Sequence, residues 1–528
     1  MIETPVFSRF AVAAPHAFAT EAGRDILAEG GNAIEAMVAM ASVIAIAYPH
    51  MNSIGGDGFW LIREPGGRVR AIEACGFAGQ LATIDRYRKL GVEAVPVRGP
   101  AAALTVPGTI GGWALALELS AGLGGRLPLR ILLENATRLA REGCPVSPSE
   151  ARTIPNEYES LKSAPGFAET FLVDGKAPAA GALRKTPKLA ETLDQLAHAG
   201  LDDFYRGDIA REMAGDLERI GSPVTRADLA AYRAKGRQPL SLRIKGATVY
   251  NTAPPTQGLA SLILLGLFER LNVRSSNGFD YFHGLIESTK RAFAIRDRVV
   301  TDFDHLRFDC DEFLTGDALD REAAKIDRAR AAPWPLPPDQ GDTVWLGAID
   351  SKGLAVSFIQ SVYWEYGSGC VLPRTGVLMA NRGLSFSLDP LAVNPLQPGR
   401  RPFHTLNPPL AVFDDGRVVS YGSMGGDGQP QFQAQVLTRY LFGEGLAAAL
   451  DAPRYLFGRT WGSGSTSVKL EGGFDGGVAG ALANAGHEIE WSAARSDAFG
   501  HAGILARNAK GGIEAAHDPR SDGGAAGS

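Results

Sequence analysis

Thr343 occupies a position at which a threonine could act as a nucleophile. It follows Gly341 and Asp342 and begins the apolar, β-rich segment TVWLGAI, and the nearest histidines in the sequence are His305 and His404. A threonine hydroxyl is a weak nucleophile until a base removes its proton, and in an N-terminal threonine the α-amine is that base. The ordinary pKa of an α-amine, about 7.7–8.0, suits this task near neutral pH. The alternative is a plain strand start, which is the commoner role for such a threonine.

The chemistry of an N-terminal threonine requires the peptide bond before Thr343 to be cut. Residues 331–342, AAPWPLPPDQGD, contain four prolines, which exclude a helix or a central strand and predict an exposed linker. The Thr343 hydroxyl can itself attack the Asp342 carbonyl in an N-to-O acyl shift. The sequence therefore predicts self-cleavage between Asp342 and Thr343 into fragments 1–342 and 343–528.

The elements that must position this threonine change in type across the linker. Before it, we predict a strand at 11–14, a helix ending at Gly30-Gly31, a second helix over 34–47, a β-hairpin over 56–74 and a mostly helical region over 125–245 with caps at Ser147 and Thr225. After it, the pattern is strand-rich, with one strand expected at 376–381 (GVLMAN), a helix at about 430–450 and a frayed tail over 514–528. Strands alternating with long helices favour stacked sheets that are covered by helices.

Composition narrows the class of protein. The 528 residues include 53 basic and 58 acidic side chains, a net charge of −5, which gives no reason to expect nucleic acid or an anionic membrane as a partner. The four cysteines are far apart and form neither a disulfide framework nor a zinc motif. Residues 2–20 contain acidic Glu3 and no apolar core of signal-peptide length, and no uncharged apolar run reaches the length of a membrane span, so we expect neither a signal peptide nor a membrane-spanning helix. We expect a cytoplasmic protein that needs no metal and no organic cofactor.

Several stretches of the chain resemble the gamma-glutamyltransferase family of N-terminal-nucleophile hydrolases. They are EAGRDILAEGGNAIEAMVA, YPHMNSIGGDGFWLI, VPGTIGGW, DTVWLGAIDSKGLAVS and SMGGDG, and they follow the family's order over most of the chain. The resemblance implies an α+β fold, a four-layer αββα sandwich made as one precursor. It also implies that the large fragment 1–342 and the small fragment 343–528 build one core as a heterodimer, and it leaves a dimer of heterodimers open.

The resemblance also assigns catalytic roles. Thr343 matches the nucleophile that becomes the new N-terminus. Gly425 and Gly426 match two glycines whose backbone N–H groups form the family's oxyanion hole, and preorganised donors of this kind often supply the largest catalytic contribution. Ser361 matches a hydroxyl that helps to orient the threonine amine. The alternatives are an ordinary β-turn for the glycines and an ordinary strand residue for Ser361.

The substrate pocket departs from the family's pattern. The position of the family's glutamate-binding arginine falls on Cys75, and the acidic residue that would hold a substrate amine is replaced by Ser385. In exchange the chain has Arg382 in ANRGLSF and the pair His404-Thr405, and an arginine fork suits a planar carboxylate. We therefore predict that Arg382, His404 and Thr405 bind the substrate. The alternative for Arg382 is a structural ion pair.

These departures favour a short amide that bears a carboxylate and lacks the amine of a gamma-glutamyl group. A subgroup of the family, the oxamate amidohydrolases, is more similar still across GDTVWLGAID, SFIQSVYWEYGSG and LMANRGLSFSL. Its activity would be hydrolysis of oxamate to oxalate and ammonia in purine catabolism. Two rival functions stay open: a gamma-glutamyl transferase or hydrolase or a glutaryl-type acylase, and a non-catalytic relative with a binding role.

Overall fold

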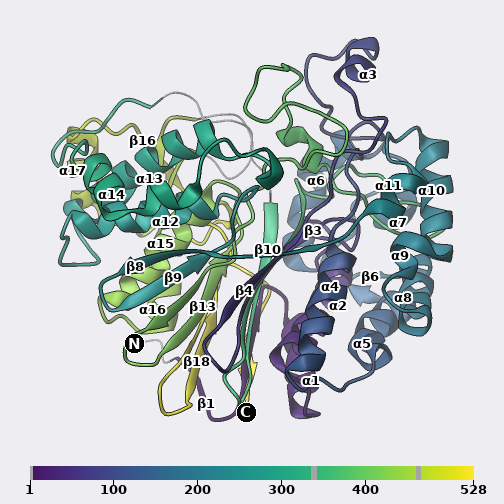
Figure 1. Ribbon diagram of the computed structural model, residues 1–528, viewed down its shortest axis with the longest axis horizontal. Coiled ribbons are helices and arrows are strands. Elements are labelled where there is room, and N and C mark those ends of the chain that lie inside the picture. Colours follow the sequence, from purple (N-terminus) through teal and green to yellow (C-terminus); the bar gives the residue numbers. More distant parts are fainter. Residues whose placement is uncertain (1–3, 335–341, 459–464) are drawn as a thin grey trace.

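Two seven-stranded sheets lie face to face, and helices cover both outer surfaces (Figure 1). The computed structural model describes residues 4–334, 342–458 and 465–528. Helices α12, α13 and α15 cover one sheet, and α1, α2, α4, α5 and α8 lie on the other side of the molecule. The four-layer αββα sandwich and the α+β class are thus confirmed.

Each sheet takes strands from both sides of the linker. The first sheet has the order β1-β18-β17-β13-β12-β9-β8, and all the neighbouring strands in it are antiparallel: β1 Val6–Phe7, β18 Ile513–His517, β17 Ala502–Arg507, β13 Val418–Ser423, β12 Leu410–Phe413, β9 Ala247–Asn251 and β8 Leu240–Ile244. The second sheet has the order β19-β2-β10-β11-β3-β4-β7 and is also antiparallel: β19 Gly524–Gly527, β2 Ala11–Ala14, β10 Asp342–Ile349, β11 Ala355–Tyr363, β3 Asp57–Arg63, β4 Val69–Ala74 and β7 Lys235–Arg237.

The helices fall into two groups by the sheet they accompany. The group on the side of the second sheet comprises α1 Ala17–Ala28, α2 Ala33–Ala47, α3 Ile84–Lys89, α4 Thr109–Gly122, α5 Leu129–Glu142, α6 Pro148–Leu161, α7 Phe167–Phe171, α8 Pro187–Ala199, α9 Asp203–Arg206, α10 Asp208–Ile220 and α11 Arg226–Ala231. The other group comprises α12 Gly258–Arg270, α13 Phe279–Val299, α14 Gly316–Ala323, α15 Gly428–Leu441, α16 Leu446–Asp451 and α17 Gly476–Asn484. Short 3₁₀ turns lie at Phe303–His305, Cys310–Leu314, Arg382–Ser385 and Asp497–Phe499. Two small sheets pair β5 Cys144–Pro145 with β6 Leu183–Arg184, and β14 Tyr455–Phe457 with β15 Val468–Glu471 and β16 Ile489–Ser492.

Three apolar layers hold the sandwich together. Helix α2 is buried along its whole length, and its Ala-rich sequence lets it pack closely against β10 and β11. Its start is fixed by a capping box in which the Asn32 side chain accepts from Glu35 N while Glu35 Oε2 accepts from Asn32 N. Between the sheets, Trp345 packs with Leu410 and Leu505, and a third layer joins α12, α13 and α15 to the first sheet. Burial of these layers is the main force that fixes the strands carrying the site.

The two predicted fragments are interleaved. Strands β10 and β11 lie between β2 and β3, and β12 lies between β13 and β9, so each sheet would contain strands of both fragments. Asp342 and Thr343 belong to one continuous strand, so the structure represents the chain before any cleavage. Cleavage at this junction stays a prediction.

Most expected elements are present, and three expectations are wrong. Strand 11–14, both N-terminal helices, the hairpin β3–β4 and the caps at Ser147 and Thr225 are confirmed. Residues 376–381 form no regular strand and make only isolated bridges, such as Met379 with Gly55. The helix expected at 430–450 is two helices, α15 and α16. The tail is not frayed, because it forms two strands. Strand β18 is next to the edge of the first sheet, and β19 is the edge strand of the second sheet.

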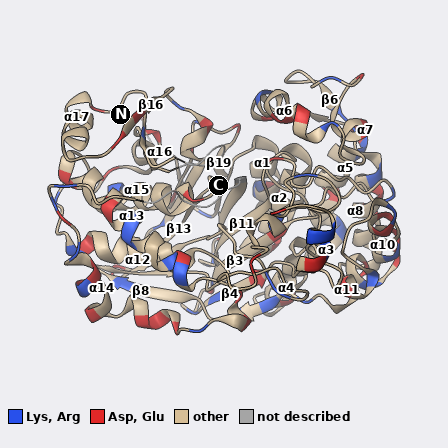
Figure 2. Cartoon of the chain, turned by 90° about the horizontal axis from the view of Figure 1, so that it is seen from above, with Lys and Arg blue, Asp and Glu red and all other residues tan. Residues whose placement is uncertain are grey.

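Basic and acidic residues are interspersed along the outer helices (Figure 2). Within the described residues, no helix combines the length and apolarity that crossing a membrane requires.

Candidate active site

Thr343 is the second residue of β10 and is fully buried. The pairing of β10 with β11 shifts register at this point, between the pairs Asp342–Tyr363 and Val344–Gln360. Gln429 in the first turn of α15 donates from Nε2 to Thr343 Oγ1 at 3.4 Å. The predicted nucleophile is therefore held at the irregular end of a central strand, where a backbone distortion can expose a peptide bond to attack.

Gly425 and Gly426 form the turn between β13 and α15, three to four residues before Gln429. Their φ angles are +116° and +52°, in the region that favours glycine, so the turn depends on this residue type. Among the described residues, neither backbone N–H group finds a hydrogen-bond acceptor. The start of a 14-residue helix follows at Gly428, and a helix N-terminus favours negative charge. This turn thus offers two donors beside the residue that contacts Thr343.

Two residues of the predicted large fragment clamp that turn. Arg296 on α13 donates from Nη1 to Asp427 Oδ1 at 2.5 Å and from Nη2 to Oδ2 at 3.2 Å. Gln257 donates from Nε2 to the Gly426 carbonyl at 2.8 Å and accepts from Arg296 Nη1 at 2.8 Å. All these side chains are buried, so the position of the glycine pair is tightly determined.

Ser361 lies on β11, close to the position of Thr343. Its hydroxyl accepts from the Tyr363 N–H at 2.8 Å, and across the sheet it pairs with Asp57 on β3. Asp57 is buried and accepts from Gly76 N at 2.8 Å. Burial raises the pKa of the Asp57 carboxyl to about 7, against the lowering effect of the hydrogen bond from Gly76. The titratable carboxyl of Asp57 therefore lies next to Ser361. The sequence analysis predicted Ser361 but not Asp57.

Arg382 is buried, and among the described residues no carboxylate lies within salt-bridge distance of it, although Asp57 and Asp427 are near enough to act on its charge. It opens a 3₁₀ turn and donates from Nε to the Phe403 carbonyl at 2.8 Å, from Nη1 to Thr405 Oγ1 at 3.4 Å and from Nη2 to Ser385 Oγ at 2.7 Å. Its guanidinium lies 3.7 Å from the centroid of the Tyr363 ring. Within the described residues it makes no ion pair, and burial lowers its pKa from the ordinary value. Among the described residues, Arg382 therefore bonds to uncharged acceptors and does not form the structural ion pair that was its alternative role.

Tyr363, the residue under this guanidinium, has φ +84°, which is rare for a side chain of its size. Such strain persists only where the surroundings fix it, and it is commonest at functional sites.

His404 and Thr405 lie beside Arg382, as expected. The His404 ring is fully buried, and neither ring nitrogen has a hydrogen-bond partner among the described residues. Its Nε2 lies 3.9 Å from Asp57 Oδ2, and burial, Arg382 and Arg401 keep its pKa well below the ordinary value, so the ring is neutral. Cys75 lies in an apolar cluster with Phe59, Ile359 and Leu406, and the Phe59 ring centroid is 5.0 Å from that of His404.

A chain of hydrogen bonds joins the predicted substrate residues to the nucleophile. Arg382 donates to Thr405 Oγ1, the Thr405 carbonyl accepts from Asn407 Nδ2 at 3.0 Å, and Asn407 Nδ2 also donates to Gln429 Oε1 at 3.2 Å. Gln429 then donates to Thr343. The structure thus brings the sequence-predicted residues Thr343, Ser361, Arg382, His404 and Thr405 and the Gly425-Gly426 turn into one region; the side chain of Asp342 lies outside the described part.

The site is closed in the uncleaved chain. Thr343 and His404 are 0% exposed and Arg382 is 2% exposed. A cavity of about 940 Å³ lies elsewhere, at the edge of the first sheet, lined by residues such as Phe268, Phe413 and Phe442. A substrate therefore needs a local rearrangement of the protein before it can reach Thr343.

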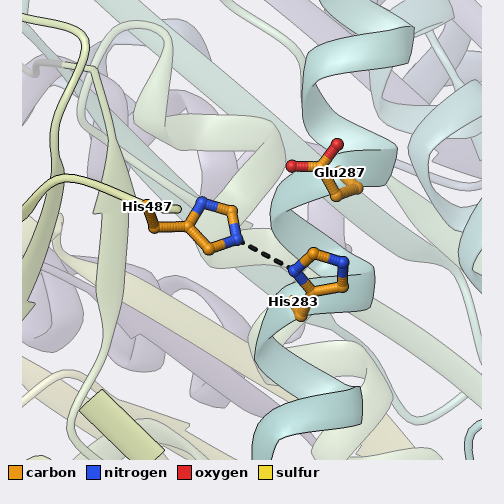
Figure 3. A group of neighbouring side chains, drawn as sticks. All are labelled: His283, Glu287 and His487. Atoms are coloured by element: carbon orange, nitrogen blue, oxygen red, sulfur yellow. Dashed lines mark hydrogen bonds between the residues drawn. The ribbon is translucent and has the colours of Figure 1, made fainter. Parts of the chain in front are cut away.

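One group of described side chains has the composition of a metal site: His283 and Glu287 on α13, and His487 (Figure 3). Their potential ligand atoms all lie within 4.8 Å of one another. This group includes none of the predicted site residues.

Comparison with known proteins decides the family. The sequence profile of the gamma-glutamyltranspeptidase family matches residues 19–528. The chain belongs to this family. It is 51% identical to the oxamate amidohydrolase proenzyme of Klebsiella pneumoniae over 516 residues, covering 97% of each chain. It is 36% identical to the glutathione hydrolase-like YwrD proenzyme of Bacillus subtilis over 520 residues, covering 98% of each.

A solved structure agrees with this assignment. The crystal structure of a cephalosporin acylase from Bacillus halodurans matches with a TM-score of 0.92 at 33% identity, covering 100% of this chain and 97% of that one. Family membership, the sandwich fold and the amide-hydrolase class, all predicted from the sequence, are thus confirmed.

Sequence reasoning missed several polar residues of this region, among them Asp57, Gln257, Asn407 and Gln429. Asp57 carried the clearest signal, because GGDGFW places a carboxylate at the start of an otherwise apolar strand. The other three lie in ordinary Gln and Asn contexts, and only the fold brings them together.

Proposed function

We propose that this chain is a self-cleaving amidohydrolase that hydrolyses a small carboxylate-bearing amide, with oxamate converted to oxalate and ammonia. The relative at 51% identity is named as an oxamate amidohydrolase proenzyme. The local observation that carries the proposal is Arg382: a buried guanidinium with no carboxylate partner among the described residues, connected through Thr405 to the Thr343 network. Burying an unpaired charge is costly, so this cation favours an anionic ligand.

Maturation begins at the junction. The Thr343 hydroxyl attacks the Asp342 carbonyl carbon, the peptide C–N bond breaks, and the nitrogen leaves as the Thr343 α-amine. Water then hydrolyses the resulting ester, giving a C-terminal carboxylate at residue 342 and restoring the Thr343 hydroxyl. The register shift at this end of β10 supports a junction that lies outside the regular ladder of the sheet.

Hydrolysis reuses the same atoms. The α-amine of Thr343 takes the hydroxyl proton as the oxygen attacks the amide carbon, and the N–H groups of Gly425 and Gly426 stabilise the oxyanion. Collapse expels ammonia, which receives the proton from the α-ammonium group. Water, deprotonated by the amine, then releases the acyl group as a carboxylate. Ser361 orients the amine, while Arg382 and Thr405 bind the substrate carboxylate, with His404 as a further contact.

The product of cleavage is a heterodimer of fragments 1–342 and 343–528, and two heterodimers could associate further. The interleaved strand order supports fragments that stay together without a covalent link.

The experiment compares two substrates on purified, cleaved protein. Ammonia release from oxamate with little transfer from a gamma-glutamyl anilide is the expected result. Efficient turnover of the anilide, with no ammonia from oxamate, would instead favour the gamma-glutamyl or glutaryl alternative. N-terminal sequencing of the smaller fragment should begin Thr-Val-Trp.

A further inference from the structure

The group His283, Glu287 and His487 in Figure 3 includes a fourth side chain, Lys290, that argues against a metal site. Lys290, one turn further along α13, donates from Nζ to Glu287 Oε1 at 2.7 Å. The four side chains are all buried. An ammonium group already neutralises the only carboxylate, so a divalent cation would add two uncompensated positive charges to a buried site, and this disfavours a metal.

What these side chains hold instead is the chain that leads to the cleavage junction. His283 Nε2 lies 2.8 Å from the Asp327 carbonyl, and Lys290 Nζ donates to the Ala332 carbonyl at 2.7 Å. Glu287 Oε2 accepts from Ala332 N at 3.2 Å. One helix of the large fragment therefore satisfies both backbone groups of Ala332 and fixes a point five residues before it.

The small fragment supplies the other half of the contact. His487 Nε2 lies 2.9 Å from His283 Nδ1, and Ala331 N donates to the Ala485 carbonyl at 2.8 Å. The centroid of the Phe457 ring lies 5.6 Å from the centroid of the Trp334 ring and 5.3 Å from Lys290 Nζ.

The histidine pair has a defined protonation pattern. If His283 donates from Nε2 to the Asp327 carbonyl, its Nδ1 carries a lone pair that accepts from His487. Burial lowers the pKa of His487 to about 3, helped by Lys290, so this ring is neutral near pH 7 and the arrangement needs no third partner.

We propose that His283, Glu287, Lys290 and His487 form an anchor that fastens residues 327–334 of the large fragment to the small fragment and thereby positions the junction for self-cleavage. These are positioning residues, and they do not touch the reacting atoms. The positioning role rests on the proposed cleavage between Asp342 and Thr343, whereas the fastening itself does not.

The size of the effect follows from chain length. Trp334 lies 8 residues before Asp342, whereas Ile326, the nearest buried residue before the anchored stretch, lies 16 before it (342 − 334 and 342 − 326). When the number of residues between two fixed points of a chain doubles, holding both points in place becomes roughly threefold less favourable. We expect Lys290→Met to slow self-cleavage by about that factor, and Lys290→Arg, which keeps the donors, to restore it.

The first experiment separates positioning from general damage. It follows the conversion of freshly synthesised full-length chain into two fragments, and then measures kcat/KM of the cleaved protein. We expect slower cleavage and unchanged kcat/KM in Lys290→Met, with no change in the matched control Lys325→Met, whose lysine pairs with Glu322 on the surface. Wild-type cleavage in Lys290→Met would overturn the positioning role.

The second experiment tests fastening on uncleaved Thr343→Ala protein, so it is informative even if wild type proves to remain one chain. Trypsin can cut after Arg330, which is exposed, only when the Ala331 and Ala332 backbone leaves its partners. We expect Lys290→Met to speed this cut by roughly tenfold or more, the effect of losing one charge-assisted hydrogen bond. If Lys290→Met misfolds, Ala332→Pro provides a second test, because it removes the N–H group that donates to Glu287. It should also speed the trypsin cut. Equal cutting rates in folded variants and parent would refute the anchor.

Metal analysis closes the remaining alternative. We expect no stoichiometric zinc in the purified full-length protein and no effect of EDTA on the trypsin cut. One bound zinc per chain, with EDTA alone freeing residues 331 and 332, would overturn the assignment of the anchor to Lys290 and Glu287.

Discussion

Replacing Arg382 by lysine keeps the positive charge but removes the paired N–H donors of the guanidinium, so it isolates what those donors contribute to binding of the substrate carboxylate. Of the five N–H donors of a guanidinium, three are used on Phe403, Thr405 and Ser385, so two remain, one on each terminal nitrogen. Lysine keeps the charge but has only three donors, and the protein acceptors alone would occupy them. The substrate carboxylate should therefore lose about one charge-assisted hydrogen bond, which is worth roughly 1–3 kcal/mol.

The assay is steady-state ammonia release from oxamate by cleaved protein. A loss of 1–3 kcal/mol corresponds to a fall in kcat/KM of roughly 5- to 150-fold. The neutral diamide oxamide, which lacks the carboxylate, should lose much less, so the preference for oxamate over oxamide should shrink in Arg382→Lys. Self-cleavage should be unchanged, because no substrate carboxylate takes part in it.

A matched control is Arg439→Lys, since Arg439 is also a mostly buried arginine but pairs with Glu444 at the end of α15. It should leave kcat/KM for oxamate near the wild-type value. The reasoning fails if Arg382→Ala hydrolyses oxamate normally, or if both substrates lose activity equally in Arg382→Lys while the precursor still cleaves.

Three further outcomes are expected. Thr343→Ala should remain a single inactive chain on a denaturing gel, and an active uncut protein would exclude the amine mechanism. Gly425→Ala should slow both self-cleavage and hydrolysis by roughly 100- to 1,000-fold, because φ +116° is unfavourable for alanine and the oxyanion donors would shift; unchanged rates would move the oxyanion hole elsewhere. Asp57 has its pKa raised to about 7, so between pH 5 and 7 the folded state binds more protons than the unfolded state and the free energy of unfolding falls as pH rises, by up to about 3 kcal/mol from this group. Denaturant titrations of Thr343→Ala protein with and without Asp57→Asn should show this slope and its loss, and an identical slope in both would contradict it.

The parts of the site that the sequence predicted lie in short motifs that resemble those of the family. Thr343 heads DTVWLGAIDSKGLAVS and the glycine pair lies in SMGGDG, and without the resemblance their local context would favour a strand start and a β-turn. Arg382 stood out because a cation appeared where the family's pattern has none. The αββα architecture was likewise predictable from motif order and from strands alternating with helices.

What was missed depends on contacts between distant segments. Gln257 and Gln429 are 172 residues apart (429 − 257), and each looks unremarkable until the fold places both around the Gly425-Gly426 turn. The tail misled for a related reason: its Gly- and Ala-rich composition suggests fraying, yet small residues suit an edge strand that packs closely. Gly527, for instance, lies so near Phe10 that an added Cβ would be 2.2 Å from the Phe10 carbonyl oxygen.

The placement of the site across both predicted fragments explains why cleavage can activate the protein without dismantling it. Thr343 and the Gly425-Gly426 turn belong to the small fragment, but Gln257 and Arg296 of the large fragment hold the turn in place. The pairs that β10 makes with β11 from Val344 onward, and all its pairs with β2, lie after the bond that precedes Thr343. Cutting that bond would free one amine, while the Gly425-Gly426 turn and Arg382, the proposed carboxylate-binding residue, would keep contacts that do not involve the junction.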